Sequence, residues 1–266
     1  MFQTIAFERT DLVARITLNR PAVLNAINDQ MMLDLSQALD RIEKEEPPVR
    51  VVVITGAGRA FSAGVDLKEL QARRGERRDW QKAVGPRTLA RIEHLPQIAI
   101  AAINGFALAG GLELAMCCDI IIASDTARIG DRHANYGLSP GGWGGSQRLT
   151  RLIGINRAKW YVLTGEDIPI EEAVRLGLVT KAVPADKLET TVQEVVDKLL
   201  SKNPRSIRAV KAMINHGVQT NLNTALELEN YIGNTVHTSS ETKEGLTAFS
   251  QKRSPDYAAV QKPEKP

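Results

Sequence analysis

The chain contains almost no cysteine. Its 266 residues include only Cys117 and Cys118, which are adjacent. Adjacent cysteines make neither a disulfide framework nor the spaced ligand pairs of a structural metal site. We therefore expect buried thiols in a reducing compartment.

Long apolar runs are also missing. No run approaches the roughly 20 residues that cross a bilayer. The first 21 residues alternate apolar and polar side chains and carry Glu8 and Asp11, which is unlike a secretory signal or a transit peptide. We expect a cytoplasmic protein with no membrane partner.

The chain has little excess charge of either sign. Its 34 Lys and Arg against 31 Asp and Glu leave a net charge of +3, which gives no global argument for nucleic acid. Residues 68–93 are the local exception, with eight basic and four acidic side chains. Such a run can be a solvated helical face, or a patch for the phosphates of a nucleotide cofactor or nucleic acid. Because acidic residues interleave with the basic ones, a nucleic-acid partner is the weaker expectation.

Strand and helix patterns alternate through the first two-thirds of the sequence, and helices dominate the last third. Continuous apolar runs at 49–55, 98–103 and 120–123 predict buried strands. From about residue 185 the pattern is helical almost to the end. The sequence predicts an α/β core with a helical extension. A Gly-Ala-Gly turn at 56–58 lacks the third glycine of a dinucleotide fingerprint.

Two segments place small residues where a loop begins a helix: FSAGVDL (61–67) and ALAGGLE (107–113). Small residues let a ligand approach the backbone, and the first turn of a helix has free N–H groups. If the two loops met, each could give one donor to a developing negative charge. Glu113, one turn inside the second helix, could then act as a base. A carboxylate that only complements the helix dipole is the simpler alternative.

Six motifs spread over essentially the whole chain occur together, namely LNRPAVLNAIN (18–28), VVVITGAGRAFSAGVDLKEL (51–70), NGFALAGGLELAMCCDIIIAS (104–124), GLSPGGWGGSQRLTRLIG (137–154), LTGEDIPIEEAVRLGLVTKAVP (163–184) and EGLTAFSQKR (244–253). Through these motifs the sequence resembles the crotonase superfamily, the enoyl-CoA hydratases and isomerases.

This resemblance implies an α/β fold: a crotonase-like spiral of ββα units at 1–200, which binds the CoA thioester, and a C-terminal helical trimerisation region at 201–266. It implies a homotrimer or a dimer of trimers, hence a homohexamer. It also implies an acyl-CoA substrate with no separate cofactor and no metal.

The matching motifs imply an active site for adding water across the α,β double bond of an enoyl-CoA. The backbone N–H groups of Val65 and Gly110 would bind the thioester oxygen, and Glu113 matches a catalytic glutamate of the hydratases. A double-bond isomerase with Glu113 as its single base is the alternative, and an RNA-binding homologue is a weaker one. The resemblance extends the substrate and CoA site to further residues, which are Ala63, Asp66, Leu67, Lys68, Gly111, Trp143, Phe249 and Lys252.

The sequence departs from the family pattern where hydratases carry a second glutamate. His133 stands at that position, and Asp131 lies two residues earlier. A histidine can donate or accept a proton near neutral pH, but His133 can equally be structural or shape the substrate pocket. If it is not an acid, isomerisation is easier to defend than hydration. We rank Asp131 lower, because it would point elsewhere if the segment were extended.

A second departure is Ala22, where the family often has a lysine near the CoA phosphates. Lys68 and the C-terminal Lys252 are candidates for that role, and Phe249 resembles an adenine contact given by a neighbouring subunit. Each of the two lysines can equally be a surface charge. Trp143 can be a wall of the acyl pocket or a core side chain.

Overall fold

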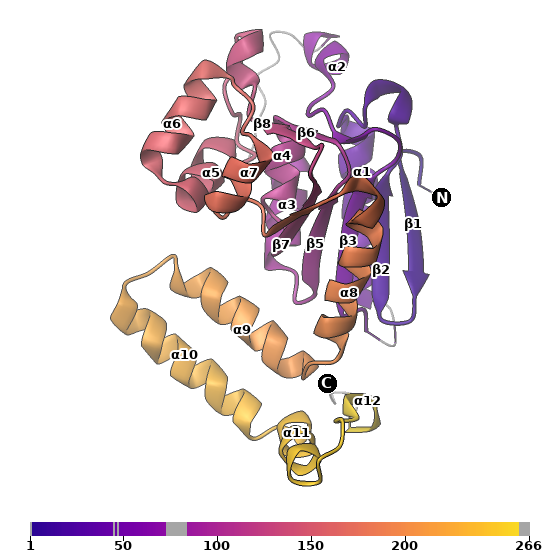
Figure 1. Ribbon diagram of the computed structural model, residues 1–266, viewed down its shortest axis with the longest axis vertical. Helices are drawn as coiled ribbons and strands as arrows, with labels where there is room; N and C mark the ends of the chain where they lie inside the picture. The colour runs from indigo at the N-terminus through magenta and orange to yellow at the C-terminus, as the bar shows by residue number, and fades with distance from the viewer. Residues whose placement is uncertain (1, 45, 47, 73–83, 261–266) are drawn as a thin grey trace. The chain divides into compact units, whose positions relative to one another are not determined.

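The computed structural model describes residues 2–44, 46, 48–72 and 84–260 (Figure 1). The chain divides into two compact units. The first comprises Met1–Leu95 and Ala99–Gln193, and the second comprises Pro96–Ile98 and Glu194–Pro266. The candidate site lies in the first unit, apart from Phe249 and Lys252.

A six-stranded sheet forms the centre of the first unit. Its strand order is β1-β2-β3-β5-β7-β9. β1 and β2 are antiparallel, joined through Asp11 at φ 50°, and β2–β3, β5–β7 and β7–β9 are parallel pairs. All six residues of β5 are buried, as the continuous apolar run predicted. The strands are β1 (Ile5–Thr10), β2 (Val13–Leu18), β3 (Val51–Gly56), β5 (Ile98–Ile103), β7 (Ile120–Ser124) and β9 (Lys181–Val183).

A second, three-stranded sheet was not predicted. It consists of β4 (Ala60–Ser62), β6 (Phe106–Leu108) and β8 (Arg128–Gly130), paired in parallel in that order. Three residues are too few to show a period-two pattern. Each of these strands directly follows a strand of the large sheet and leads into a helical segment. This is the repeated ββα arrangement that the resemblance implied.

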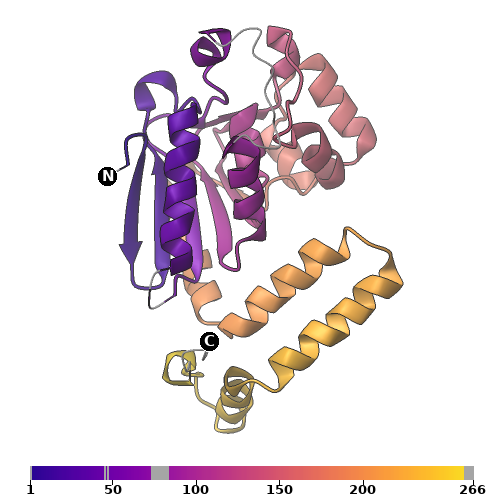
Figure 2. The same cartoon turned by 180° about the vertical axis from the view of Figure 1, so that it is seen from behind.

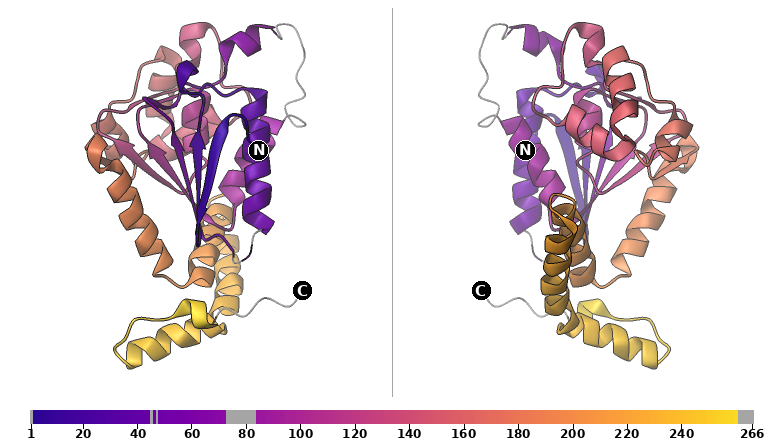
Figure 3. Two further views of the ribbon diagram at one scale, coloured as in Figure 1. Left: turned by 90° about the vertical axis from the view of Figure 1, so that its right-hand side faces the viewer. Right: turned by 90° about the vertical axis from the view of Figure 1, so that its left-hand side faces the viewer.

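Helices pack against the large sheet and bury the side chains of its strands. α1 (Asp29–Lys44) and α3 (Val84–His94) contact each other and lie on one face (Figures 2 and 3). The side of α1 that carries Leu35 and Leu39 is fully buried in the core. The remaining helical segments of this unit are η1 (Pro21–Val23), α2 (Leu67–Ala72), α4 (Gly110–Ala115), η2 (His133–Tyr136), α5 (Gly145–Ile153), α6 (Ile155–Thr164), α7 (Ile170–Arg175) and η3 (Ala185–Lys187).

The C-terminal unit is helical, as predicted. α8 (Leu188–Leu200) leads into it, and α9 (Pro204–Gly217), α10 (Leu222–His237), α11 (Ser240–Ser250) and α12 (Tyr257–Val260) follow. Asn203, Asn221 and Ser239 end the connections by capping the next helix with their side-chain oxygens. Large apolar side chains on these helices are exposed. In the described part of the chain, no helix combines the length and apolarity needed to cross a membrane.

Candidate active site

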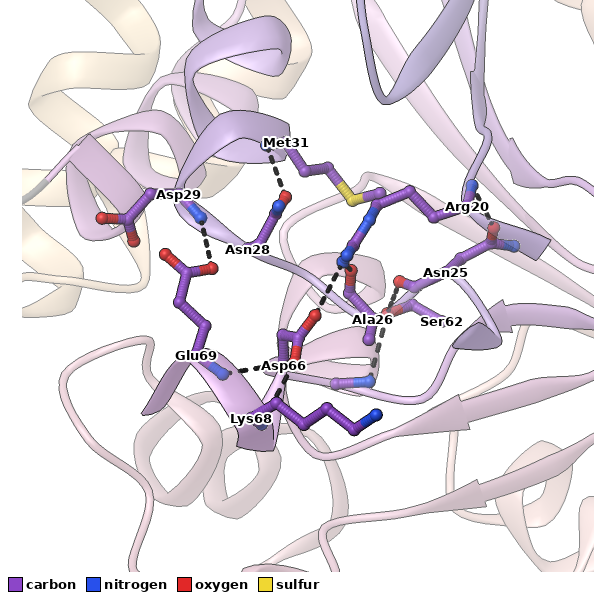
Figure 4. Close-up of polar contacts among 11 residues, drawn as sticks. Arg20, Asn25, Ala26, Asn28, Asp29, Met31, Ser62, Asp66, Lys68 and Glu69 are labelled. Carbon is purple, nitrogen blue, oxygen red and sulfur yellow. Dashed lines mark hydrogen bonds and ion pairs between the residues drawn. The ribbon is translucent and has the colours of Figure 1, made fainter. Parts of the chain in front are cut away.

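The loop before α2 is held by a network of polar contacts (Figure 4). Asp66 caps α2, accepting the N–H groups of Lys68 and Glu69 at 3.2 and 3.4 Å. Its other oxygen accepts Nη1 of Arg20 at 3.0 Å. Burial acts to raise the pKa of Asp66, but the Arg20 bond and charge and the two backbone donors lower it overall. Asp66, predicted to bind substrate, therefore shapes the loop.

These contacts fix the backbone on both sides of Val65. Gly64 donates its N–H to Ser62 Oγ at 3.1 Å and accepts the N–H of Ile27 at 2.7 Å. Asp66 donates its own N–H to the Ile27 carbonyl at 2.9 Å. Among the described residues the N–H of Val65 itself has no hydrogen-bond partner. The loop thus holds one free donor in a fixed orientation.

The second glycine loop lies directly against the first. A Cβ on Gly64, at φ +97°, would stand 3.1 Å from the backbone nitrogen of Gly110, and one on Gly111 would stand 2.4 Å from the Ser62 carbonyl oxygen. Only glycine allows this approach. Gly110 begins α4, so its N–H is outside the helical bonding pattern, and the described residues offer it no other partner. The sequence could not show that the loops meet; the structure brings both predicted donors together.

Glu113 extends from α4 and is 2% exposed. Its Oε1 accepts the N–H of Gly145, the first residue of α5, at 2.7 Å. Burial raises the pKa of this carboxyl; the Gly145 bond and the charges of His133 and Arg148 oppose the rise, and the charge of Asp131 adds to it. A carboxylate of raised pKa is a better proton acceptor once ionised.

Asp131 and His133 form a buried pair beside Glu113. Asp131 Oδ1 lies 2.9 Å from His133 Nδ1, and the two residues are 2% and 8% exposed. A Cβ on Gly145 would be 2.8 Å from Glu113 Oε1 and 3.1 Å from Asp131 Oδ2. The two carboxylates therefore lie on either side of the position that a side chain at residue 145 would occupy. Because residue 145 is glycine, no side chain fills that position.

The reason given for ranking Asp131 low is wrong. β8 ends at Gly130, and Arg132 has φ 56°, so the chain turns and is not extended here. The turn at Arg132 brings His133 back against Asp131, whose Oδ2 lies on the Glu113 side of the site near Gly145. Burial acts to lower the pKa of His133, but the hydrogen bond to Asp131 and the charges of Asp131 and Glu113 raise it overall.

The Trp143 ring packs against the glycine loop at Gly110. A Cβ on Gly110 would be 2.9 Å from Cζ3 of the indole and 3.3 Å from Cγ2 of Val65. The ring is 7% exposed and belongs to the main hydrophobic cluster. Trp143 is thus a core side chain that also touches the predicted site.

Arg148 was missed by the sequence analysis. It donates to the Trp143 carbonyl at 2.8 Å and makes two bonds to the Glu93 carboxylate at 2.6 and 3.2 Å. It therefore joins α5, the glycine-rich loop and α3. In the sequence it is one arginine of an amphipathic helix, and nothing local distinguishes it from Arg151.

The other predicted residues differ in position. Ala63 and Gly111 lie in the two meeting loops, while Leu67 and Lys68 are exposed at the start of α2. Phe249, 85% exposed, and Lys252 belong to the C-terminal unit, so their roles stay predictions.

Within the described residues, no group of three His, Cys, Asp or Glu is arranged to hold a metal ion. Residues 73–83, which carry five of the eight basic side chains of the 68–93 run, fall outside the part that the structure describes.

The architecture agrees with comparisons to known proteins. The family model "Enoyl-CoA hydratase/isomerase" matches residues 8–260. A short-chain-enoyl-CoA hydratase of Clostridium acetobutylicum is 38% identical over 250 residues, 94% of this chain and 95% of that protein. A crotonyl-CoA hydratase of Syntrophomonas wolfei is 36% identical over 257 residues, 96% and 98% of the two chains. A crystal structure of an enoyl-CoA hydratase from Bacillus anthracis matches with a TM-score of 0.89 at 39% identity, over 96% of this chain and 99% of that one.

The chain therefore belongs to the enoyl-CoA hydratase/isomerase, or crotonase, family. It is an enzyme of this family, and its fold is the α/β fold that the sequence predicted. The family implies an acyl-CoA substrate.

Proposed function

We propose that this enzyme adds water across the α,β double bond of an enoyl-CoA thioester. The observation that carries the proposal is the buried Glu113 carboxylate beside the buried Asp131–His133 pair, with Glu113 and Asp131 on either side of the position that a Gly145 side chain would take. Hydration needs a base for the water and an acid for the α-carbon. The site offers a candidate for each.

The thioester oxygen would accept the N–H groups of Val65 and Gly110. Attack on the β-carbon drives the electrons of the double bond onto this oxygen, giving an enolate. Fixed donors stabilise that charge without reorganisation, and losing one typically raises the barrier by roughly 3 kcal/mol.

Glu113 would take a proton from the attacking water, whose oxygen bonds to the β-carbon. The enolate then collapses, and its α-carbon takes a proton from the His133 imidazolium. Asp131 holds Nδ1 of the ring, which leaves Nε2 to give that proton. One proton returned from Glu113 to His133 completes the cycle, and the net change is the addition of one water.

The raised pKa values of both groups suit this assignment. The raised pKa of His133 keeps the imidazolium charged toward neutral pH, and the raised pKa of Glu113 makes its carboxylate a stronger base. Isomerisation by Glu113 alone needs no second proton donor, so the Asp131–His133 pair would have no role in that reaction. This comparison favours hydration over the single-base alternative.

The test compares the wild type with Glu113→Gln on crotonyl-CoA and on a 3-enoyl-CoA, followed by enoyl-thioester absorbance. We expect hydration by the wild type and a loss of about 10²–10⁴-fold in the variant. Glu229→Gln, an exposed position on α10, is the control. Equal hydration by wild type and Glu113→Gln would overturn the assignment, and wild-type turnover of the 3-enoyl-CoA alone would favour isomerisation.

A further inference from the structure

Two buried polar groups, one on Trp143 and one on α3, have no hydrogen-bond partner among the described residues. They are the indole Nε1–H of Trp143 and the Oγ1 hydroxyl of Thr88, whose residues are 7% and 1% exposed. Buried donors in folded proteins are nearly always paired, so each exception asks for an explanation. Neither group takes part in the hydration chemistry proposed above.

The two groups lie on elements that touch. Gly85 and Thr88 are one turn apart on α3 and share its buried face. A Cβ on Gly85 would be 3.0 Å from Trp143 Nε1 and 2.9 Å from Cζ2, so the nitrogen-bearing edge of the indole lies against this face. The opposite edge, at Cζ3, lies against Gly110. The ring therefore extends from the predicted thioester site toward the buried face of α3 that carries the Thr88 hydroxyl.

We propose that Trp143 Nε1 is a specificity donor for an acyl chain that carries an oxygen beyond the reacting double bond. This inference rests on the proposed hydratase function. A hydroxyl or oxo group in that place would accept from Nε1–H, and Thr88 Oγ1 can donate to or accept from the same oxygen. A plain hydrocarbon chain would leave both groups unpaired. The oxygenated chain is therefore the better substrate, because the cost of burying the donor is removed only when it binds.

The experiment compares hex-2-enoyl-CoA with analogues that carry a hydroxyl or oxo group at C5 or C6. We expect the wild type to have a higher kcat/KM for at least one oxygenated analogue, by about two- to tenfold for one hydrogen bond. Trp143→Phe keeps an aromatic ring and removes the N–H, so it should abolish this preference. The readout is the ratio of the two kcat/KM values in each protein, which does not change with a loss that is common to both substrates.

The controls separate specificity from folding and from the chemistry. Trp160→Phe changes an exposed indole whose nitrogen bonds Glu166, and it should keep the preference. Thr88→Val, nearly the same shape without the hydroxyl, should reduce the preference in part. If Trp143→Phe changed the kcat/KM of all substrates equally, or if the wild type showed no preference, the inference would fail while hydration of hex-2-enoyl-CoA still stood. Absence of hydration with every substrate would instead overturn the proposed function.

Discussion

The two sides of the candidate site hold their charge in opposite ways. Glu113 is a single carboxylate on a helix, buried with one neutral donor, the N–H of Gly145. Asp131 and His133 form a hydrogen-bonded pair after a strand, in which the Asp131 carboxylate raises the pKa of His133 and so favours its charged form. Burial therefore works against the ionised state on the Glu113 side, while pairing supports it on the other.

The difference has a consequence for catalysis. A poorly stabilised carboxylate accepts a proton readily, whereas a paired imidazolium holds one until a strong base such as an enolate takes it. The two environments suit the base and the acid of the proposed hydration. The following experiments are designed to break or sharpen this contrast.

The largest effect in this series is expected at the paired side. His133→Ala should lower kcat/KM for crotonyl-CoA about tenfold or more, because the α-carbon loses its acid. Asp131→Asn removes the charge that raises the pKa of His133, so the basic limb of the pH–rate profile should move to lower pH. Asp125→Asn, at an exposed loop position, is the control. Near-normal rates for His133→Ala would mean that the histidine is structural.

An intermediate effect is expected at Arg148. Its charge opposes the rise in the pKa of Glu113, and its bond to Trp143 holds the loop that leads to Gly145. Arg148→Met should raise the pKa of Glu113 further and move the acidic limb of kcat/KM to higher pH, so the loss is several-fold larger at pH 6 than at pH 8. Arg148→Lys should restore the limb in part, since it returns the charge without the paired bonds.

The matched control for this series is Arg151→Met. Arg151 lies one turn further along α5, and its Nη1 bonds only Gln147 of the same helix. The pH dependence of kcat/KM for Arg151→Met should equal that of the wild type. A lower melting temperature for Arg148→Met with an unmoved acidic limb would show that Arg148 only stabilises the fold.

The smallest effect concerns stability. Because the pKa of Glu113 is raised in the folded state, the group contributes stability below its unfolded pKa and loses it as pH rises through the folded pKa. Glu113→Gln cannot ionise, so its melting temperature should exceed that of the wild type at pH 8 and approach it at pH 4. In a protein of this size about 2–4 °C correspond to 1 kcal/mol. The melting temperatures are measured by calorimetry. If the difference between Glu113→Gln and the wild type did not grow with pH, burial of the Glu113 charge would not be unfavourable.

Most elements could be predicted from the sequence because their signals are local. β5 was placed at its observed bounds by a continuous apolar run, and the helical pattern after residue 185 matches the helices of the C-terminal unit. The short strands β4, β6 and β8 were missed, since three residues carry no readable period. Glu113 was found because a carboxylate follows two glycines at the start of a helix.

The sequence by itself determined the family, the alternation of strands and helices, the two glycine loops and the candidate base. Tertiary structure alone decided that Gly64 meets Gly110, that Asp131 and Glu113 flank Gly145, and that Arg148 joins three elements. Gly145 and Glu113 are 32 residues apart, and Arg148 and Glu93 are 55 apart. Periodicity records which side of its own element a residue faces. Which residues of other elements it meets depends on how the strands and helices pack, and here on turns such as that at Arg132, which brings His133 against Asp131.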